Sequence, residues 1–517
     1  MSAFVQKHGD AVTGILSGFD RLIFHGQLQR LMDIGFMLAF LRFSKVRLED
    51  FGAYAKATSA QVIKASLSKA KALNRPTPYV YSAAIRKDEQ AKVIAAHDNI
   101  KTGLVCVLRI VEPCHTFDVF REHGGQLRRA FRKCLHLYHY FMHPTMGLMH
   151  VRLQTWFPFR MQVYVNGREW LSRTLDGAGI EYLKHDNCFL RIADMARAQQ
   201  LFSAQLQMDW LPFFNAMVSE CNPAFSDVFK NFNIEYYWTL HQSEWATDVM
   251  FKDTQALDAV YPRLIRHAIT TFDSPSVMRF LGRHVPATGQ VMGNFKGEVV
   301  TWYKRLPECI RIRHALNENS LKLYNKGSVL RVETTINNTK EFKVFRPKEG
   351  DRKGRKSWRP LRRGIADIGR RAEVCQSSNL RYLDALAKVE HDETFGQLLE
   401  QPCRHTIWNG KRVRALQPCG QDAELLAAIG DGAFAINGFR NRDLGQKLFS
   451  TAAHTKQEAR RRSAHITRKL HILRAHGLIN KVHKTHRYQL TAKGRSIVAA
   501  TTAASKANAN KLIDLAA

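Results

Sequence analysis

The sequence is short of acidic residues and of long apolar runs. Its 517 residues include 78 Lys and Arg but only 45 Asp and Glu, a formal net charge of +33. The best apolar run, Ile34–Leu41, ends at Arg42 and is too short for the roughly 20 residues of a membrane span. The N-terminal residues lack the charged head and apolar run of a secretory signal peptide. We therefore expect a cytoplasmic protein with no membrane partner.

Clustered cysteines and several catalytic motifs are also missing. The nine cysteines are scattered and form no CxxC pair, which is typical of reduced thiols and not of a disulfide framework or a zinc site. The sequence contains no P-loop, no GxSxG elbow and no HExxH helix. It therefore gives no support to nucleotide hydrolysis, to an esterase or to a zinc protease.

The excess of positive charge predicts a polyanionic partner, either DNA or structured RNA. The chain is 45% hydrophobic and 24% charged, an ordinary globular composition that favours folded domains over disorder. We expect an α+β multidomain fold in four regions. These are a mixed α/β N-terminal domain at 1–145, a central α+β domain with a mixed or antiparallel sheet at 146–345, a basic arm and helical linker at 346–420, and a nucleic-acid-binding domain at 421–517.

Apolar spacing predicts several elements. The segment Ser59–Leu73 has the apolar period of a helix, and Gly103–Val111 is an apolar, β-branched run typical of a buried strand. Leu201–Val218 also has a helical pattern, which Pro212 is expected to kink or split. Two alternating segments around an Asn- and Gly-containing connection, Leu321–Ile336, predict a β-hairpin.

The C-terminal segment carries the most specific pattern in the chain. A helix over Gln457–Ala475 ends at a glycine, and a hairpin with a basic tip and the string "YQLTAKGR" follow. This order resembles the winged-helix domain of bacterial regulators over Asn437–Ala500. The resemblance implies a helix in the major groove and a wing on the adjacent backbone, although winged helices also bind proteins and RNA. The expected nucleic-acid contacts are Arg460, Arg461, Arg462, Arg468, Lys469, Arg474, Lys481, Lys484 and Arg487.

A second basic cluster lies at Lys343–Arg371. Its first half, Pro347–Pro360, contains Gly, Pro and cations but no apolar period, so we expect a loop or mobile arm. Its second half has a helical pattern that continues past Tyr382. The arm residues expected to contact phosphates are Arg352, Lys353, Arg355, Lys356, Arg359, Arg362 and Arg363.

The predicted hairpin at 319–336 is the second distinctive feature. Strand alternation places Lys322, Tyr324 and Lys326 on one face of its first strand, and Arg331 with Glu333 on one face of its second. The pattern K-x-Y-x-K…L-R-x-E resembles a hairpin of rolling-circle replication initiators of plasmids and filamentous phages. The resemblance implies that Glu333 binds Mg²⁺ or Mn²⁺ and that the three cations contact phosphates. The alternative is an ordinary surface hairpin with a charged solvent face.

Such initiators commonly carry a His-hydrophobic-His motif on a strand, and this sequence departs from that pattern. The nearest segment is Leu135–His143, in which a helix would bring His136, His139 and His143 to one face. That spacing suits metal ligands, but it also suits hydrogen-bonded histidines on an aromatic helix face.

The aromatic segment 233–248 offers further catalytic candidates. Glu244 and Asp248 share a face in either a helix or a strand, and with Glu333 they provide carboxylates for a metal that aligns phosphodiester transfer. Tyr236 and Tyr237 are candidate nucleophiles, because a phenolate that attacks phosphate forms a covalent intermediate. The alternative for both acids is structural pairing with arginines.

Aromatic and basic residues alternate in other parts of the chain, a pattern that suits stacking of unpaired bases beside phosphate contacts. Arg311 and Arg313 alternate with apolar residues and predict a strand whose cations face phosphates. Core packing is the alternative role for most of the aromatic side chains.

Motifs such as "SGFDRLIFHG" and "GSVLRVETTIN" resemble a group of uncharacterised bacterial proteins whose scattered occurrence suggests a mobile-element context. The combined prediction is a mobile-element or plasmid-type DNA-processing protein that uses Mg²⁺ or Mn²⁺ for nicking or strand transfer. Two alternatives remain open: a non-catalytic structured-RNA-binding protein of a ribonucleoprotein, and a winged-helix transcriptional regulator.

Overall fold

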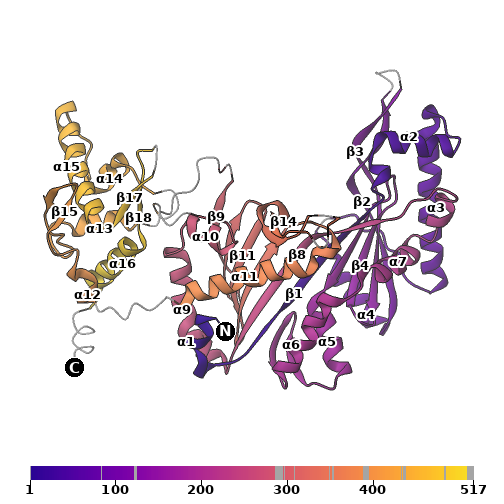
Figure 1. Ribbon diagram of the computed structural model, residues 1–517, viewed down its shortest axis with the longest axis horizontal. Coiled ribbons are helices and arrows are strands. Elements are labelled where there is room, and N and C mark those ends of the chain that lie inside the picture. Colours follow the sequence, from indigo (N-terminus) through magenta and orange to yellow (C-terminus); the bar gives the residue numbers. More distant parts are fainter. Residues whose placement is uncertain are drawn as a thin grey trace. The chain divides into compact units, whose positions relative to one another are not determined.

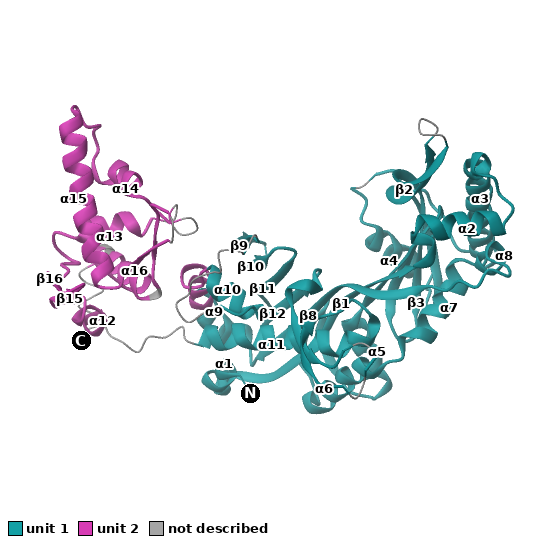
Figure 2. Cartoon of the chain, turned by 45° about the horizontal axis from the view of Figure 1, so that its top comes forward, with its two compact units in different colours: residues 1–262, 274–387 teal, residues 263–273, 388–517 magenta. Residues whose placement is uncertain are grey.

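The computed structural model of the chain is shown in Figure 1. It describes residues 2–82, 84–120, 125–285, 295, 297–307, 309–348, 350–351, 354–387, 395–431, 434, 438–482 and 485–508. Two compact units are formed, one by residues 1–262 and 274–387 and the other by residues 263–273 and 388–517 (Figure 2). Among the described residues, no helix combines the length and apolar character needed to cross a bilayer.

The first unit is built on a ten-stranded antiparallel sheet with the order β2-β3-β4-β5-β1-β8-β12-β11-β10-β9. Its strands are β1 (Val12–Gln27), β2 (Gly103–Phe120), β3 (Gln126–His143), β4 (Gly147–Gln154), β5 (Met161–Asn166), β8 (Tyr237–Phe251), β9 (Val299–Arg305), β10 (Ile310–Leu316), β11 (Asn319–Lys326) and β12 (Val329–Ile336). The N-terminal strand β1 is central, between β5 and β8. The expected domain boundary at 145 is therefore not a structural boundary, because β3 and β4 pair across it.

Helices cover both faces of this sheet. The helices that precede or follow its strands are α1 (Ala3–Lys7), α2 (Ile34–Phe43), α3 (Phe51–Ala72), α4 (Lys87–His97), α5 (Gly167–Gly177), α6 (Met195–Ala204), α7 (Trp210–Cys221), α8 (Phe225–Val228), α9 (Thr254–Thr270), α10 (Ser274–Phe280) and α11 (Ile368–Leu386). The residues of α9 from Arg263 on belong to the second unit. The helix predicted over 201–218 is split, not kinked: α6 ends at Ala204, and Pro212 lies in the first turn of α7. A proline is tolerated there because the first-turn N–H groups have no helical partner.

α11 is anchored to one face of β8 and β12 by Asn379. Its side-chain amide donates to the carbonyls of Trp245 and Val332, at 3.2 and 3.1 Å, and its oxygen accepts from the Thr334 hydroxyl at 2.6 Å. The opposite face is covered in part by α5, α6 and the hairpin of β6 (Tyr182–His185) and β7 (Cys188–Ile192). Leu16, Leu171, Phe189, Phe202, Met250 and other apolar residues form the core there.

β3 replaces the helix considered for 135–143. Its alternation places His136 and His139 on opposite faces of the sheet, and His139 Nε2 is bonded to Ser66 Oγ of α3 at 2.6 Å. The two histidines therefore do not form a ligand set. The predicted helix at 59–73 and the predicted strand at 103–111 are confirmed as parts of α3 and β2, and the hairpin is confirmed as β11–β12.

In the segment 347–360, predicted as a loop or mobile arm, the described residues before Ser357 lie in no helix or strand, but its last four residues form a strand. This strand, β14 (Ser357–Pro360), pairs with β13 (Lys343–Arg346), which directly precedes the predicted loop, and the hairpin belongs to the first unit. The predicted helical second half is confirmed from Ile368 onward as α11, which continues past Tyr382 as expected. Arg352 and Lys353 lie outside the described residues.

The second unit contains α12 (Phe395–Glu400), β15 (Thr406–Trp408), β16 (Lys411–Val413), α13 (Ala423–Ile429), α14 (Asn441–Leu448), α15 (Lys456–Ala475), β17 (Ile479–Lys481), β18 (Tyr488–Leu490) and α16 (Ala492–Lys506). The predicted order of a long helix, a short hairpin and a last helix is present. Leu470, Leu473 and Leu478 lie in the core of the unit, as their spacing indicates. The assignment of this unit to the winged-helix class stays a prediction.

Candidate metal and phosphate site

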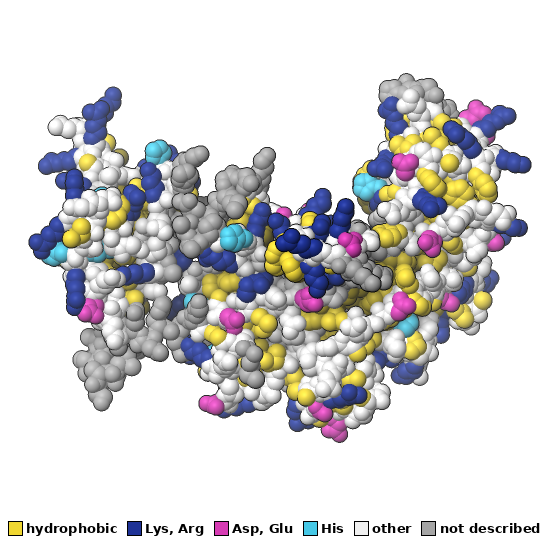
Figure 3. All heavy atoms as spheres, in the orientation of Figure 1, with side chains coloured by type: hydrophobic (Ala, Val, Ile, Leu, Met, Phe, Trp, Pro, Cys, Tyr) yellow, Lys and Arg dark blue, Asp and Glu magenta, His cyan; other side chains and the backbone are white. Residues whose placement is uncertain are grey.

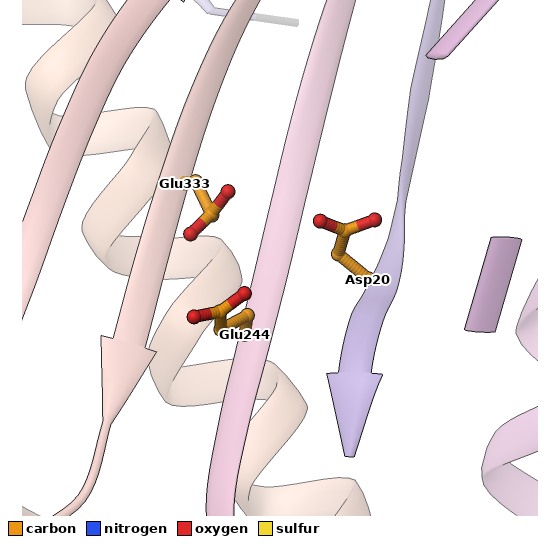
Figure 4. A group of neighbouring side chains, drawn as sticks. All are labelled: Asp20, Glu244 and Glu333. Carbon is orange, nitrogen blue, oxygen red and sulfur yellow. The ribbon is translucent and has the colours of Figure 1, made fainter. Parts of the chain in front are cut away.

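Three carboxylates converge at the centre of the large sheet. One oxygen each from Asp20, Glu244 and Glu333 lies within 4.8 Å of the other two, and all three residues are buried (Figure 4). They come from the adjacent strands β1, β8 and β12. Among the described residues, this is the one group of three or more His, Cys, Asp or Glu side chains close enough to share a metal ion. The structure thus brings together two of the predicted carboxylates and one that was not predicted.

Strand alternation directs Glu244 and Glu333 away from α11. Their chain neighbours Trp245 and Thr334 lie on the face to which Asn379 of α11 is bonded. Figure 4 shows the three carboxylates in front of their strands, with the helix behind. The two glutamates are two residues out of register, since Glu333 is paired with Ala246.

A β-bulge places Asp20 in the group. Phe19 is paired with Trp245 and Arg21 with Glu244, so Asp20 is an extra residue in β1 at this point. Bulges re-aim side chains near functional sites. Asn187 Nδ2 donates to Asp20 Oδ1 at 2.7 Å and holds the carboxylate in place.

Cations flank the three carboxylates. Lys322 Nζ lies 2.5 Å from Glu333 Oε1 and 3.5 Å from Glu244 Oε1. The Tyr324 hydroxyl donates to Glu333 Oε2 at 3.0 Å, and Arg21 Nε lies 3.6 Å from Glu244 Oε2. The Arg21 side chain is 45% exposed, whereas that of Glu333 is 3% exposed. The rim of the site is therefore cationic and its floor acidic.

The pKa values of the three acids are shifted in different directions. Burial raises the pKa of Asp20, and it also raises the pKa of Glu244, an effect increased by the charge of Glu333. Burial acts in the same sense on Glu333, but the charge and hydrogen bond of Lys322 outweigh it and lower the pKa of Glu333. The surroundings thus favour the ionised form of Glu333 and disfavour that of Asp20 and Glu244, and a bound cation would favour ionisation of these two.

Asp248 and Arg331 form a buried ion pair, contrary to their predicted roles as metal ligand and phosphate contact. The pair adjoins the carboxylate site, because Arg331 Nη1 also lies 3.6 Å from Asp20 Oδ2. Arg331 Nε lies 2.6 Å from Asp248 Oδ1, and Arg168 Nη1 lies 3.1 Å from Asp248 Oδ2. Asp248 shares a face of β8 with Glu244, but four residues separate them, about 13 Å along a strand. The structural alternative, pairing with arginine, applies to Asp248.

Neither predicted tyrosine nucleophile is near the carboxylates. The buried Tyr236 hydroxyl donates to the Phe159 carbonyl at 2.7 Å, and burial raises its pKa. Tyr237 is 50% exposed but lies seven residues along β8 from Glu244, about 23 Å. Tyr324 does reach the site, yet burial and the charge of Glu333 raise its pKa well above the usual range. No phenolate is favoured at the site by these surroundings.

The predicted phosphate-binding residues of the sheet differ in availability. Arg313 is exposed on β10 and Arg311 is half-buried beside it. Lys326 is paired with Asp186, with Nζ and Oδ2 2.5 Å apart.

Some predicted contacts of the arm hold the fold together. Arg362 is paired with the buried Asp367 at 3.1 Å, and Arg363 donates to the Asn337 carbonyl at 3.2 Å. Arg355 and Lys356 are exposed, and Arg359 is half-buried in β14. Figure 3 shows Lys and Arg side chains gathered around β14 and along α15.

On α15, Arg460, Arg461 and Arg468 are exposed. The other predicted contacts of the second unit are only partly available: Arg462 is paired with Glu458, Lys469 lies 3.5 Å from Asp422 Oδ1, and the Arg474 guanidinium lies over the Trp408 ring. Lys481 is exposed and Arg487 half-buried. Lys484 lies outside the described residues.

No family model, curated protein or solved structure matches the chain. The interpretation of the carboxylate site therefore depends on its own geometry and charge.

Proposed function

We propose that the protein is a metal-dependent DNA-processing enzyme that cleaves or transfers phosphodiester bonds at Asp20, Glu244 and Glu333. The observation that carries the proposal is the convergence of these three buried carboxylates, within 4.8 Å of one another, beneath a cationic rim. The charge of the whole chain, +33, favours a polyanionic substrate.

The donor set suits Mg²⁺ or Mn²⁺. Both ions prefer carboxylate and other oxygen ligands, and the group contains three carboxylates and no nitrogen or sulfur ligand. Buried carboxylates this close repel one another, and the raised pKa of Glu244 records that repulsion together with burial. Lys322 supplies part of the compensating charge in the structure. An ion bound by the acids would release Lys322 toward a substrate phosphate.

A divalent cation held there would polarise a phosphodiester oxygen and lower the pKa of a bound water molecule. The chain's own residues supply position and charge. Asn187 orients Asp20, and the Tyr324 hydroxyl fixes the second oxygen of Glu333. Arg21, at the exposed rim, neutralises charge that develops on the phosphate. Because neither Tyr236 nor Tyr237 is near the acids, we propose water as the nucleophile for nicking.

A second candidate is a non-catalytic binder of structured RNA or DNA. The contacts that favour it are those of Lys322 and Arg21 with the glutamates, which already make the group a buried ion network. In that case the carboxylates stabilise the sheet, and the exposed arginines of α15 bind the nucleic acid. A winged-helix transcriptional regulator would use the second unit and leave this site without a role. The mobile-element or plasmid setting stays a prediction.

Metal-dependent nicking of supercoiled DNA and cleavage of a labelled single strand test the proposal. We expect Glu333→Gln and Asp20→Asn each to reduce the cleavage rate by about 100-fold or more. Mutation of a residue that only supports a metal ligand typically reduces activity by about 10- to 100-fold, and loss of the ligand itself should reduce it further. Glu373→Gln makes the same substitution at an exposed position of α11 and should leave the rate unchanged. Thermal unfolding confirms that each variant is folded. Equal rates for all four proteins, or no cleavage with either metal, would refute the enzyme proposal in favour of the binder.

A further inference from the structure

We propose that the face of the large sheet formed by β9, β10 and β11 binds a single strand of nucleic acid and leads it to the carboxylates on β12, β8 and β1. This inference rests on the proposed function and deepens it, because it specifies an unpaired strand as the substrate. It is carried by strand register, exposure and charge, none of which depends on a bound metal.

The register aligns one cross-strand row with the site. Trp302 of β9 is paired with Arg313 of β10, Arg313 with Lys322 of β11, and Lys322 with Glu333 of β12. Paired residues lie on the same face of a sheet, and neighbouring strands are about 4.8 Å apart. The row therefore runs about 14 Å from the edge strand to the carboxylates on a single face.

The row lies on the face away from α11. The intervening residues Ile312 and Leu323 are buried on the other face, and His314 Nε2 is bonded to the Tyr382 hydroxyl of α11 at 2.9 Å. Trp302 is 49% exposed, and Arg313 is exposed as well. The edge of this sheet face is therefore open to a ligand.

The charge of this surface is positive and uncompensated. Lys304 and Arg311 form a second cross-strand pair, two residues along β9 and β10 from Trp302 and Arg313. Within the part of the chain that the structure describes, no acidic side chain is within ion-pair distance of Lys304, Arg311 or Arg313. Three unpaired cations on one side of an acidic site favour a polyanion whose backbone crosses the strands.

Trp302 favours an unpaired strand over a duplex. The Arg313 guanidinium lies 5.4 Å from the centre of the indole ring, which fixes the ring against β10. A flat ring of this kind stacks on a base, and base faces are accessible in single strands, whereas a duplex keeps them stacked on one another. Stacking tolerates any base, so both single-stranded DNA and single-stranded RNA satisfy this chemistry.

Beyond the carboxylates the same face continues into a depression of about 820 Å³ lined by Tyr164, Asn166, Asn187 and other residues, among them four acidic and three basic side chains. Arg21 is paired with Asn166, and its guanidinium lies 5.8 Å from the centre of the Tyr164 ring. Asn187 links the depression to the site through its hydrogen bond to Asp20. The strand therefore has polar and aromatic contacts available on both sides of the carboxylates.

β9 supplies its own matched controls. Tyr303 is 68% exposed and Arg305 is also exposed, but alternation places both on the opposite face from Trp302 and Lys304. The experiment compares Trp302→Ala with Tyr303→Ala, and Lys304→Ala with Arg305→Ala, in the full chain. Fluorescence anisotropy, measured without divalent metal, follows binding of labelled thymidylate and uridylate oligomers of about 15 nucleotides and of a duplex of equal length.

We expect Trp302→Ala to weaken single-strand binding by about five-fold or more and to leave duplex binding unchanged. Trp302→Phe, which keeps a flat ring, should restore most of the affinity. Lys304→Ala should weaken binding and reduce the salt slope by about one, as loss of one phosphate contact requires. Tyr303→Ala and Arg305→Ala should stay within about two-fold of the parent protein, because neither residue lies on the proposed path. The comparison of the two oligomers then shows whether DNA or RNA is preferred.

Equal effects at the two members of either pair, or equal losses for the single strand and the duplex, would contradict the inference. Melting temperatures of the five variants exclude misfolding as the cause of a loss. Because binding is measured without metal, the result is independent of the nicking assay. Loss of cleavage in Glu333→Gln with no contrast between Trp302 and Tyr303 would preserve the enzyme and refute the path. The reverse result would preserve the path and refute the enzyme.

Discussion

At the scale of single residues, Lys322 decides how the acidic group behaves. Its ammonium contacts both glutamates, but it lowers the pKa of Glu333 while Glu244 keeps a raised pKa. The two glutamates are therefore predicted to respond to pH in opposite senses, although they lie side by side.

The stability of the folded chain should show this opposition. A raised pKa in the folded state means that Glu244 contributes stability below its ordinary titration range and loses it as pH rises through the folded pKa. In metal-free buffer, Glu244→Gln should therefore unfold at a higher temperature than the parent protein at pH 7, and this advantage should shrink toward pH 4. Calorimetric scans across this range measure the effect.

Glu333→Gln should show the opposite sign. Its lowered pKa stabilises the fold above the ordinary range, and this stability is lost as pH falls through the folded pKa. The variant should be less stable than the parent at pH 7, with a difference that diminishes in acid. Destabilisation of equal size by both substitutions at pH 7 would contradict the assigned ionisation states.

Sequence patterns reach some of these residues and miss others. Glu333 lies in the predicted hairpin and Glu244 in the aromatic segment 233–248, so the sequence points to both. It does not point to Asp20 in the same way. The sequence does contain a signal. Aspartate is rare in buried strands unless it is paired or has a function, so the aspartate inside the apolar run "GFDRLIF" marks a candidate site residue. The bulge that aims Asp20 at the glutamates depends on pairing with β8, which is more than 200 residues away in the chain. Local spacing contains no information on such a pairing.

At the scale of elements, β1 and α6 pack closely beside the site, on the same face of the sheet. A Cβ atom at Gly18 would lie 2.0 Å from the Phe202 ring of α6, so this helix can approach the strand only at a glycine. The same core includes Leu16, two residues earlier in β1. The position of Asp20 thus depends on the tight packing at Gly18, two residues before it in β1.

Gly18→Val should destabilise the first unit by about 1–3 kcal/mol, the usual cost of overpacking a core. Gly52→Ala is the control, because Gly52 lies on the exposed face of α3 with no atom within 4 Å of a new Cβ. That change should be neutral or stabilise the unit by about 0.4–1 kcal/mol. Urea unfolding of both variants measures the difference, and an unaltered midpoint for Gly18→Val would contradict the packing described.

The helices and strands that can be predicted from the sequence are those whose apolar residues recur with one dominant spacing. The β11–β12 hairpin combines alternation with a turn sequence, and α15 combines apolar spacing with a terminal glycine, so both were located. The segment 135–143 fits a helical spacing of histidines, yet it belongs to a strand because its long pairing with β2 outweighs that local pattern. The loop prediction for 347–360 misses β14, because a strand of four residues is too short to show an apolar period.

At the scale of the whole molecule, the net charge of +33 is divided between the two units. The first unit exposes Lys304, Arg313, Arg355 and Lys356, and the second exposes arginines along α15. The four regions expected from composition became two units, because strands from the first two regions share one sheet. Composition changes along a chain do not reveal such pairing.

Each exposed arginine that is removed from α15 should weaken the proposed binding of nucleic acid. Arg461→Gln combined with Arg468→Gln removes two exposed cations seven residues apart on α15, which should reduce the salt slope of duplex binding by about two. Lys447→Gln, at a lysine already paired with Asp431, is the control and should change the slope little. Filter binding over a range of salt concentrations provides the slopes. Identical slopes for both variants would exclude α15 from the interface.

Manganese binding tests the central claim most directly, because it depends on the three carboxylates and on no substrate. Calorimetric titration of the full chain with Mn²⁺ should show one site that Asp20→Asn and Glu333→Gln each weaken by about 100-fold, while Glu373→Gln leaves it intact. Binding that is absent from the parent protein, or that all three variants retain equally, would contradict the assignment of Asp20, Glu244 and Glu333 as a metal site.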